Sequence, residues 1–406
     1  MPTNYGRSPW TEQFPKSRVP VYPRHRGPLI TDVVVVGGGL TGCAAAYAFA
    51  VAGVKVVLLE AAQVGRGSTA FEAGWISDEP GVAFADLEKA IGARRARRGF
   101  QAWRRAALDF SALLRRLDVK CALEARPAIT VALTPEQSAH MKREQKARRS
   151  ADLDAPLIAG RAVAADVGLA AVAGLRAKDG ATLDPYRACL GLAAAAKARG
   201  ALVFERSPVV KTTFGRKDTD VFTPGGRIHA ARVVVATGRP TALFKSLARH
   251  FWFKSAYLTL TAQVPAKVRQ QLGRRQAVVR DVAEPPHVIR WVDDQRLLVA
   301  GANTATPPAR LRDKVVVQRT GQLMYELSTL YPDISGLQPD FGWSADYART
   351  AEGIPYIGPH RNYPWHLFAF GDSSHSVTGA YLASRVLLRH YFEEMDPADE
   401  VFAFTR

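Results

Sequence analysis

The stretch from Asp32 to Gly74 constrains the fold of this 406-residue chain more than any other part of it. Four valines, 33–36, are followed at once by the glycine turn Gly37-Gly38-Gly39-Leu40-Thr41-Gly42 and an alanine-rich segment that ends at Gly53. A second apolar run, 54–59, then ends on Glu60. This order predicts strand, turn, helix and strand, which is the context in which Gly-x-Gly-x-x-Gly binds a dinucleotide. A glycine turn that binds nothing is the alternative.

Each position of this turn has an expected task. The first glycine permits the tight turn, the second lets the backbone approach a pyrophosphate, and the third lets the helix pack close to the strand. The helix start then offers its unpaired amides and positive dipole end to the phosphates. The expected contacts are Gly37, Gly39, Leu40, Thr41 and Gly42. Glu60 would accept hydrogen bonds from ribose hydroxyls and repel a 2′-phosphate, which favours FAD or NAD over NADP.

A second glycine-rich loop follows, with Gly67, Ser68, Thr69 and Gly74 as expected cofactor contacts. A simple nicotinamide dehydrogenase has no need of this loop, whereas an extended FAD needs more backbone at its flavin end. At this point the chain resembles the D-amino acid oxidase-like family of FAD-dependent oxidoreductases, which includes glycine and sarcosine oxidases and γ-glutamylputrescine oxidoreductases. The resemblance implies oxidation of a C–N bond in a small amine or amino acid, by hydride transfer to the flavin.

Later segments carry the same resemblance. It implies that Val209 passes over the adenine and that the apolar strand 233–238, ending in Thr237-Gly238, approaches the cofactor. The run 349–359 is similar to a family motif, and the loop after Gly371 leads into a helix that faces the flavin. Expected cofactor contacts there are Gly371, Asp372, Val377 and Thr378. The family usually has glycines where this chain has Ser373, Ser374 and Ser376, and this departure weakens the expectation of ordinary oxidase chemistry.

The expected fold class is α/β, with a Rossmann-type FAD-binding domain and a second, mainly antiparallel β-sheet substrate domain with helices. Alternating short apolar runs between residues 250 and 343 predict the strands of that sheet. We expect an irregular N-terminal arm over 1–29 and a discontinuous FAD-binding domain over 30–90, 155–245 and 344–406. The substrate domain would then comprise 91–154 and 246–343. The arm either packs along the body or is a disordered tail.

Cysteine usage bears on the cofactor and the compartment. Cys43, Cys121 and Cys189 are far apart, which excludes a dithiol motif of the usual spacing and a zinc cluster, so no metal is expected. Some relatives attach FAD through a histidine after Gly-Ser-Thr or through a late cysteine. Ala70 and Phe71 follow Thr69 here and no cysteine follows Cys189, so non-covalent FAD is expected. Reduced cysteines, no signal peptide and no apolar stretch of bilayer length predict a cytoplasmic protein.

The substrate site needs an anchor, commonly an arginine fork to a carboxylate. Arg290 and Arg349 are the candidates, because both lie in segments that line the pocket of the family; each also fits a structural ion pair. Tyr257 is expected to bind the substrate by a hydrogen bond or to lie in the core. His375 is a cofactor-side candidate. No acid–base triad is apparent, and flavin chemistry does not require one.

The net charge of +18 leaves two further functions open. Arginine-rich helices near 94–98 and 142–149 are the best nucleic-acid candidates, and a flavin enzyme acting on tRNA is one alternative. Solvated basic faces are favoured, so nucleic acid is not an expected partner. A flavin-binding protein without amine turnover is the other alternative. The expected partners are a small amine or amino acid and an electron acceptor, oxygen or a quinone.

Overall fold

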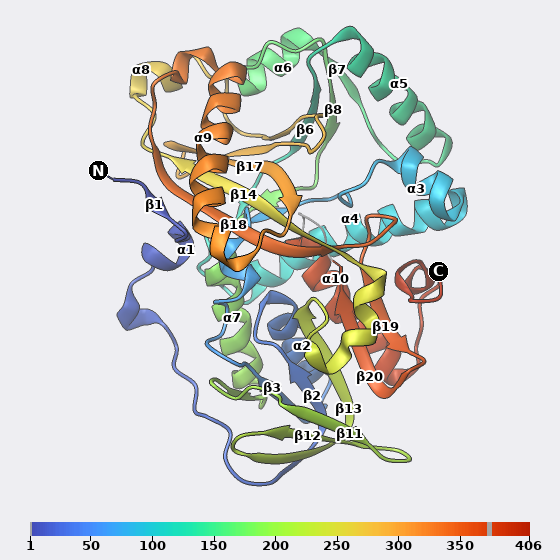
Figure 1. Ribbon diagram of the computed structural model, residues 1–406. Coiled ribbons are helices and arrows are strands. Elements are labelled where there is room, and N and C mark those ends of the chain that lie inside the picture. Colours follow the sequence, from blue (N-terminus) through green and yellow to red (C-terminus); the bar gives the residue numbers. More distant parts are fainter. Residues whose placement is uncertain (1, 372–375) are drawn as a thin grey trace.

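The computed structural model describes residues 2–371 and 376–406, so the predicted contacts Asp372 and His375 lie outside the described residues. The molecule has two halves (Figure 1): a lower one around β2, β13 and α2, and an upper one around β14 and β17. The N-terminal segment runs along both.

The sheet of the lower half has the strand order β10-β3-β2-β13-β12-β11, and β20 also pairs with β13 and with β19. Strands β10, β3, β2, β13 and β20 are parallel to one another, whereas β11, β12 and β19 run antiparallel to their neighbours. The strands are β2 (Leu29–Val36), β3 (Val56–Leu59), β10 (Leu202–Phe204), β11 (Lys211–Phe214), β12 (Thr219–Thr223), β13 (Gly226–Gly238), β19 (Tyr356–His360) and β20 (Tyr363–Phe370).

The parallel strands form here because both faces of the sheet are covered, and the valines 33–36 of β2 are all buried. Helix α2 (Leu40–Val51) packs against α7 (Pro185–Ala198) and α10 (Ser376–Phe392), and its alanines allow that close approach. It ends before Gly53, which takes a φ of 80°. The predicted strand–turn–helix–strand unit is therefore present.

The upper half contains a nine-stranded sheet in which only the pairs β1–β18 and β15–β6 are parallel. Helix α9 (Arg312–Leu330) lies against strands β14, β17 and β18. In sheet order the strands are β1 (Asn4–Tyr5), β18 (Pro339–Arg349), β14 (Trp252–Thr261), β17 (Arg296–Ala305), β16 (Val288–Val292), β15 (Val278–Arg280), β6 (Ala128–Ala132), β8 (Ala173–Ala177) and β7 (Leu157–Ala159). The predicted fold class, a Rossmann-type layer with a mainly antiparallel second sheet, is confirmed.

The remaining elements are shorter or connect the halves. A three-stranded sheet joins β4 (Trp75–Ile76), β9 (Ala181–Thr182) and β5 (Glu124–Ala125). The other helices are α1 (Pro9–Glu12), α3 (Phe84–Ile91), α4 (Ala93–Arg116), α5 (Pro135–Ser150), α6 (Gly160–Val167) and α8 (Ala266–Arg269). The 3₁₀ turns are η1 (Lys16–Arg18), η2 (Ser68–Phe71), η3 (Ala242–His250), η4 (Ala309–Leu311), η5 (Pro332–Ile334) and η6 (Asp399–Phe402).

The division of the chain between the halves differs from the expected boundaries. Strands β7 and β8 belong to the nine-stranded sheet, so the chain returns to the lower half near α7 rather than at residue 155. All of β18 also belongs to that sheet, which moves the last boundary from 344 to about 350. Helix α4 lies in the range 91–154 that was expected in the substrate domain, but it packs against α10 of the lower half. Phe110 on α4 stacks on Tyr381 on α10, with 5.1 Å between the ring centroids. Short apolar strands do not by themselves reveal which sheet they join.

The N-terminal arm is packed along both halves. Strand β1 pairs with β18 at the edge of the nine-stranded sheet. Trp10 is buried and donates through Nε1 to the carbonyl of Glu72 at 2.8 Å. Further along, the amide of His25 donates to Ser207 Oγ at 2.9 Å in the lower half. Of the two readings of this segment, packing along the body is the one that the structure shows.

Candidate functional site

The glycine turn after β2 has the close contacts that only glycine permits. Gly37 has a φ of 107°, and a Cβ on it would lie 2.7 Å from the carbonyl oxygen of Ala236 on β13. A Cβ on Gly42 would lie 1.8 Å from the carbonyl oxygen of Gly37. Helix α2 thus starts directly against the turn, with the amides of Thr41 and Gly42 in its first turn, where no intrahelical acceptors are available. This arrangement fits a pyrophosphate.

The second glycine loop lies against the first. Thr69 Oγ1 accepts a hydrogen bond from the amide of Leu40 at 2.9 Å, and a Cβ on Gly39 would lie 3.2 Å from the same oxygen. A Cβ on Gly238, at the end of β13, would lie 3.9 Å from Ser68 Oγ. The ends of β2 and β13 and the start of η2 therefore lie together around the glycine turn, as the cofactor assignment requires.

Glu60 stands at the end of β3 with its carboxylate turned toward the glycine turn. Its Oε2 accepts from the amide of Gly38 and its Oε1 from the amide of Ala62, both at 2.7 Å. A carboxylate has further lone pairs, so it can still accept from ribose hydroxyls. The amide of Ser207 donates to the carbonyl of Glu60 at 2.9 Å, which brings the segment before Val209 alongside. The residues present therefore fit the adenosine half of FAD.

Other predicted cofactor residues fall into three groups. Thr237 lies next to the first turn, its amide 3.3 Å from a Cβ placed on Gly37, and the amide of Gly371 faces the carbonyl of Gly238 at 3.5 Å. Gly67 is exposed before η2, with open space around it. The third group, Gly74, Val377 and Thr378, is buried in contacts with protein. A Cβ on Gly74 would lie 2.2 Å from the Leu183 carbonyl oxygen. The Thr378 hydroxyl donates to the Ser77 carbonyl oxygen at 2.8 Å.

All three cysteines are buried and free. The sulfur atoms of Cys43 and Cys189 lie 3.6 Å apart behind the glycine turn, each within 3.6 Å of the carbonyl oxygen of Gly38. The hydrogen bond with Cys189 and burial both raise the pKa of Cys43, and burial raises the pKa of Cys121 to about 11. The neutral thiol is thus favoured at Cys43 and Cys121, and all three cysteines are packed in the core.

The nine-stranded sheet has two faces with different partners. Leu258 and Trp343 share a buried core with α2 and α10, whereas Tyr257 and Val299 share one with α9. Successive side chains of a strand point to opposite faces. We call the side of Leu258 the inner face, since it is turned to the lower half, and the other side the outer face. A substrate between the two halves would meet the inner face.

Two predicted substrate residues are held in contacts with protein. Tyr257 is buried on the outer face, and its hydroxyl lies 3.3 Å from Thr304 Oγ1. Arg290 is buried, and its Nε and Nη2 donate to the carbonyls of Ala73 and Leu183 at 2.6 and 3.1 Å. Burial lowers the pKa of Arg290 to about 10, against the opposing effect of nearby carboxylates. Arg290 therefore fastens the second glycine loop, so we do not retain either residue as a substrate contact.

Arg349, the other predicted anchor, ends β18 and is exposed. Residues that lie directly opposite each other on β14 and β18 form rows of side chains on the inner face. From the interior outward, these rows are Leu258 with Trp343, Ala256 with Ala345, Lys254 with Tyr347, and Trp252 with Arg349. Asn303 on β17 joins the third row, because its Nδ2 donates to the Tyr347 hydroxyl at 3.0 Å. Lys254, Asn303 and Tyr347 were not among the predicted residues; alternation counted from Leu258 would have found Lys254.

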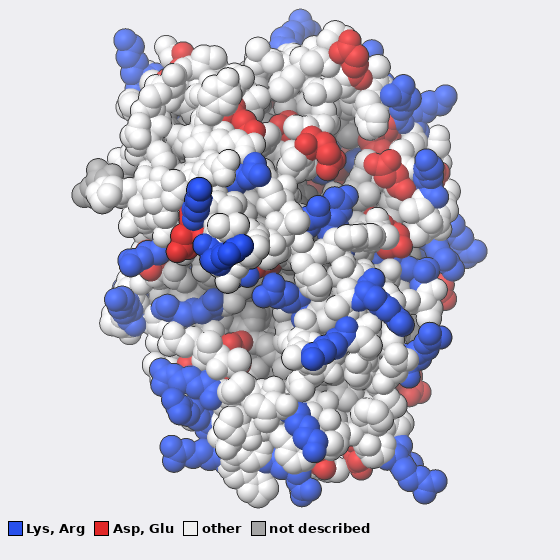
Figure 2. All heavy atoms as spheres, viewed as in Figure 1, with Lys and Arg blue, Asp and Glu red and all other residues white. Residues whose placement is uncertain are grey.

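Figure 2 shows the surface hollowed between the two halves, with Lys and Arg side chains gathered around the hollow. Tyr347 is one of the groups influenced by the charges of this region. Burial raises its pKa, Arg349 and the hydrogen bond from Asn303 oppose this rise, and the carboxylates of Glu284 and Glu72 add to it. Charged groups of both signs from three segments thus act on the same hydroxyl.

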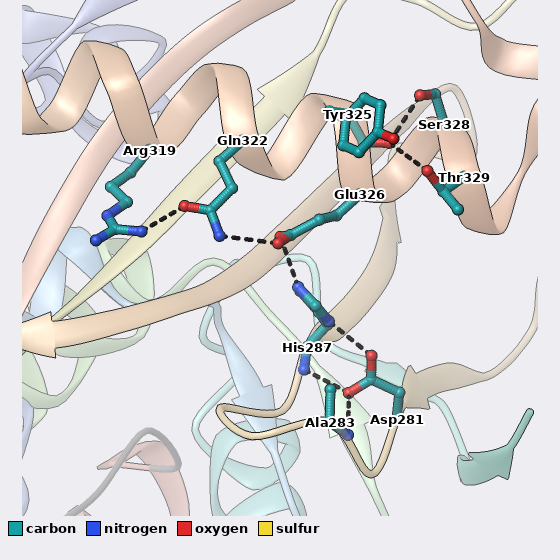
Figure 3. Close-up of polar contacts among 9 residues, drawn as sticks. All are labelled: Asp281, Ala283, His287, Arg319, Gln322, Tyr325, Glu326, Ser328 and Thr329. Carbon is teal, nitrogen blue, oxygen red and sulfur yellow. Dashed lines mark hydrogen bonds and ion pairs between the residues drawn. The ribbon is translucent and has the colours of Figure 1, made fainter.

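A half-buried histidine, His287, fastens the loop between β15 and β16 to α9. His287 Nδ1 lies 2.6 Å from Asp281 Oδ2, and its Nε2 lies 2.9 Å from Glu326 Oε2 (Figure 3). Asp281 Oδ1 also accepts from the amides of His287 and Ala283, and Gln322 on α9 donates to the Glu326 carboxylate. This loop carries Glu284, one of the carboxylates whose charge acts on Tyr347.

The His287 cluster predicts a specific loss of stability in alkali. Burial lowers the pKa of His287, but its hydrogen bonds and ion pairs with Asp281 and Glu326 raise it to about 9. Because the folded-state pKa lies above the unfolded value of about 6.5, the stabilisation is complete below pH 6.5 and is lost as the pH rises through 9. We expect His287→Gln to lower the melting temperature at pH 6.5 and to make little difference at pH 10. Differential scanning calorimetry of both proteins measures this; a deficit that does not vary with pH would contradict it.

Residues 2–371 and 376–406 lack two kinds of structural feature. None of the helices in this range combines the length and apolar character needed to cross a lipid bilayer. In the same range, no three His, Cys, Asp or Glu side chains gather in a group able to hold a metal ion.

A Rossmann-type layer with a dinucleotide turn, a second glycine loop and a second, mainly antiparallel sheet defines a two-domain flavoprotein. Residues 32–389 match the sequence profile of the family described as FAD dependent oxidoreductase (DAO). The chain belongs to this family of FAD-dependent oxidoreductases.

Named relatives are distant but cover most of the chain. It is 26% identical to γ-glutamylputrescine oxidoreductase of Escherichia coli, over 90% of this chain and 85% of that protein. It is 24% identical to glycine oxidase of Bacillus licheniformis, over 88% and 93%. Among solved structures, glycine oxidase from Geobacillus kaustophilus superposes with a TM-score of 0.73 at 18% identity, covering 91% of this chain and 96% of that one. L-amino acid deaminase from Proteus myxofaciens gives a TM-score of 0.75 at 16% identity, covering 96% of both.

Proposed function

We propose that the protein oxidises a C–N bond of a small amine or amino acid, of the CH–NH or CH–NH₂ type, with FAD held non-covalently. The observation that carries this proposal is the convergence of the two glycine loops and Glu60 beneath the inner face of the antiparallel sheet. Family membership supports the flavin, and relatives named glycine oxidase and γ-glutamylputrescine oxidoreductase support the C–N bond.

The residues of the chain bind and orient. The first turn of α2 would hold the pyrophosphate, Glu60 the ribose hydroxyls and the segment at Val209 the adenine. FAD supplies the chemistry when bound: it accepts a hydride from the carbon that bears the amine, and the resulting iminium of the substrate is hydrolysed by water. Arg349 remains the candidate anchor for a substrate carboxylate, and the inner face of the sheet excludes water from the reacting carbon.

Electron acceptor and compartment are part of the same proposal. We infer that oxygen or a quinone reoxidises the flavin and that the protein works in the cytoplasm. Three buried, unpaired cysteines support a reducing compartment.

Anaerobic absorbance spectroscopy tests the proposal. We expect a yellow protein that releases FAD on acid denaturation and loses its flavin absorbance when one class of amine or amino acid is added. A protein that cannot be reconstituted with FAD would refute the cofactor assignment. A flavin that no amine reduces would instead support a binding role without turnover.

A further inference from the structure

Two of the three cysteines meet behind the glycine turn. Cys43 lies in the first turn of α2 and Cys189 near the start of α7, and these two helices lie side by side in the lower half (Figure 1). Their Sγ atoms are 3.6 Å apart, and both side chains are fully buried. The fold therefore brings two thiols from distant parts of the chain within reach of a single covalent bond.

Both thiols also contact the same atom of the glycine turn. The carbonyl oxygen of Gly38 lies 3.5 Å from Cys43 Sγ and 3.6 Å from Cys189 Sγ, and it accepts a hydrogen bond from the amide of Gly65 at 2.9 Å. The amide of Gly38 in turn donates to Glu60. Since a thiol is a weak hydrogen-bond donor, the two cysteines help to hold the turn to which the pyrophosphate is assigned.

A bond between the two sulfur atoms would disturb this arrangement. The sulfur atoms of a disulfide are about 2.0 Å apart, so the pair would have to close by about 1.6 Å. Bond formation also removes both S–H donors from the Gly38 carbonyl. Because Cys43 belongs to the first turn of α2, its displacement acts directly on the helix start beside the glycine turn.

We propose that Cys43 and Cys189 form an oxidative modification site, at which hydrogen peroxide converts the two thiols to a disulfide and so weakens the binding of FAD to the glycine turn. One thiol is first oxidised to a sulfenic acid with release of one water. The other thiol then attacks this sulfur, and a second water leaves as the S–S bond forms. Two electrons thus pass from the thiols to the peroxide, and the two thiols with one peroxide give one disulfide and two waters.

The reaction should be slow in the folded protein. The hydrogen bond with Cys189 and burial both raise the pKa of Cys43, so little of the reactive thiolate is present. Peroxide reaches buried groups only when the structure opens locally. We therefore expect the conversion to take minutes to hours rather than seconds. The site goes beyond the proposed function, since it requires peroxide but no amine substrate.

Alkylation followed by mass spectrometry tests the site, with Cys121 as the internal control. Cys121 is equally buried but, within the described residues, contacts no other cysteine. The purified protein is incubated with hydrogen peroxide, unfolded and alkylated with iodoacetamide. We expect the untreated protein to be alkylated at all three cysteines and the treated protein at Cys121 alone, with a linked peptide pair that contains Cys43 and Cys189. Alkylation of all three after peroxide treatment, or loss of Cys121 at the same rate, would overturn the proposal.

The variant Cys43→Ser shows whether the pair is the target or a single thiol. Serine retains a hydrogen-bond donor beside Gly38 but cannot form the disulfide. Peroxide should leave Cys189 fully alkylated in this variant. If Cys189 is lost as fast as in the wild type, it is oxidised alone, and the proposed pair is wrong. Cys189→Ser provides the reciprocal measurement on Cys43.

The affinity for FAD is the second readout, measured by flavin fluorescence on protein from which the cofactor has been removed. We expect oxidised wild type to bind FAD about 5-fold more weakly than reduced wild type, the effect of losing weak S–H···O contacts. Dithiothreitol should restore the affinity, and peroxide should not change that of Cys43→Ser. Equal affinities of the two wild-type forms would refute the link to the cofactor. If neither form binds FAD, the cofactor assignment of the proposed function fails and this link fails with it.

Discussion

Gly42→Ala is expected to give a protein that no longer retains FAD on purification. The added Cβ would lie 1.8 Å from the carbonyl oxygen of Gly37, which is backbone and cannot move without opening the turn. Overpacking of this kind costs about 1–3 kcal/mol, so FAD affinity should fall about 10- to 100-fold or more, and the free energy of unfolding should fall with it. The ratio of flavin to protein absorbance and the dissociation constant of added FAD measure the effect.

Gly321→Ala is the matched control for this substitution. Gly321 lies within α9, where a Cβ would meet nothing within 4 Å. Alanine is favoured over glycine in a helix by about 1 kcal/mol, so this variant should be slightly more stable and fully yellow. If both alanine variants bind FAD equally well, the assignment of the turn after β2 as the pyrophosphate site is wrong.

The cofactor half of the molecule was predictable because its signals are local. The valines of β2, the glycines of the turn and Glu60 lie within 29 residues, and their tasks follow from backbone sterics alone. The contacts between Leu40 and Thr69 and between Gly238 and Ser68 then require only that parallel strands end at the same edge of the sheet.

The substrate half was less predictable because both faces of its sheet are apolar. Tyr257 and Leu258 are adjacent and both buried, so the sequence alone does not tell which of them faces α9. The register between β14 and β17 also shifts between Ser255 and Tyr257, where Ala302 takes a φ of 50°, and such a bulge changes which residues share a face.

Arg290 illustrates a different limit of sequence reasoning. Its position in an apolar strand indicates importance, but an arginine that binds a carboxylate and one that donates to main-chain carbonyls have the same sequence. Only the carbonyls of Ala73 and Leu183, contributed by segments more than 100 residues away, distinguish the two roles.

Glu144→Ala is expected to be the most destabilising single substitution considered for this protein. Glu144 is buried on α5, where it forms an ion pair with Arg148 at 2.7 Å and accepts from the amides of Phe84 and Ala85 at the start of α3. Its removal leaves Arg148 with Glu79 as its remaining partner and uncaps α3. Breaking a buried ion pair from one side costs about 3–5 kcal/mol, to be measured by urea unfolding of the purified proteins.

The substitution should affect the site as well as the stability. Arg148 forms an ion pair with Glu79 in the loop before α3, and Arg280 donates to the carbonyl of Gly81 in the same loop. Arg104→Ala is the control, since Arg104 pairs with Asp179 in a partly exposed ion pair for which about 0–1 kcal/mol is expected. Equal losses of stability in the two variants would show that burial of the Glu144 pair contributes nothing beyond a surface ion pair. A large loss for Glu144→Ala alone would instead show that the buried pair contributes to stability well beyond a surface ion pair.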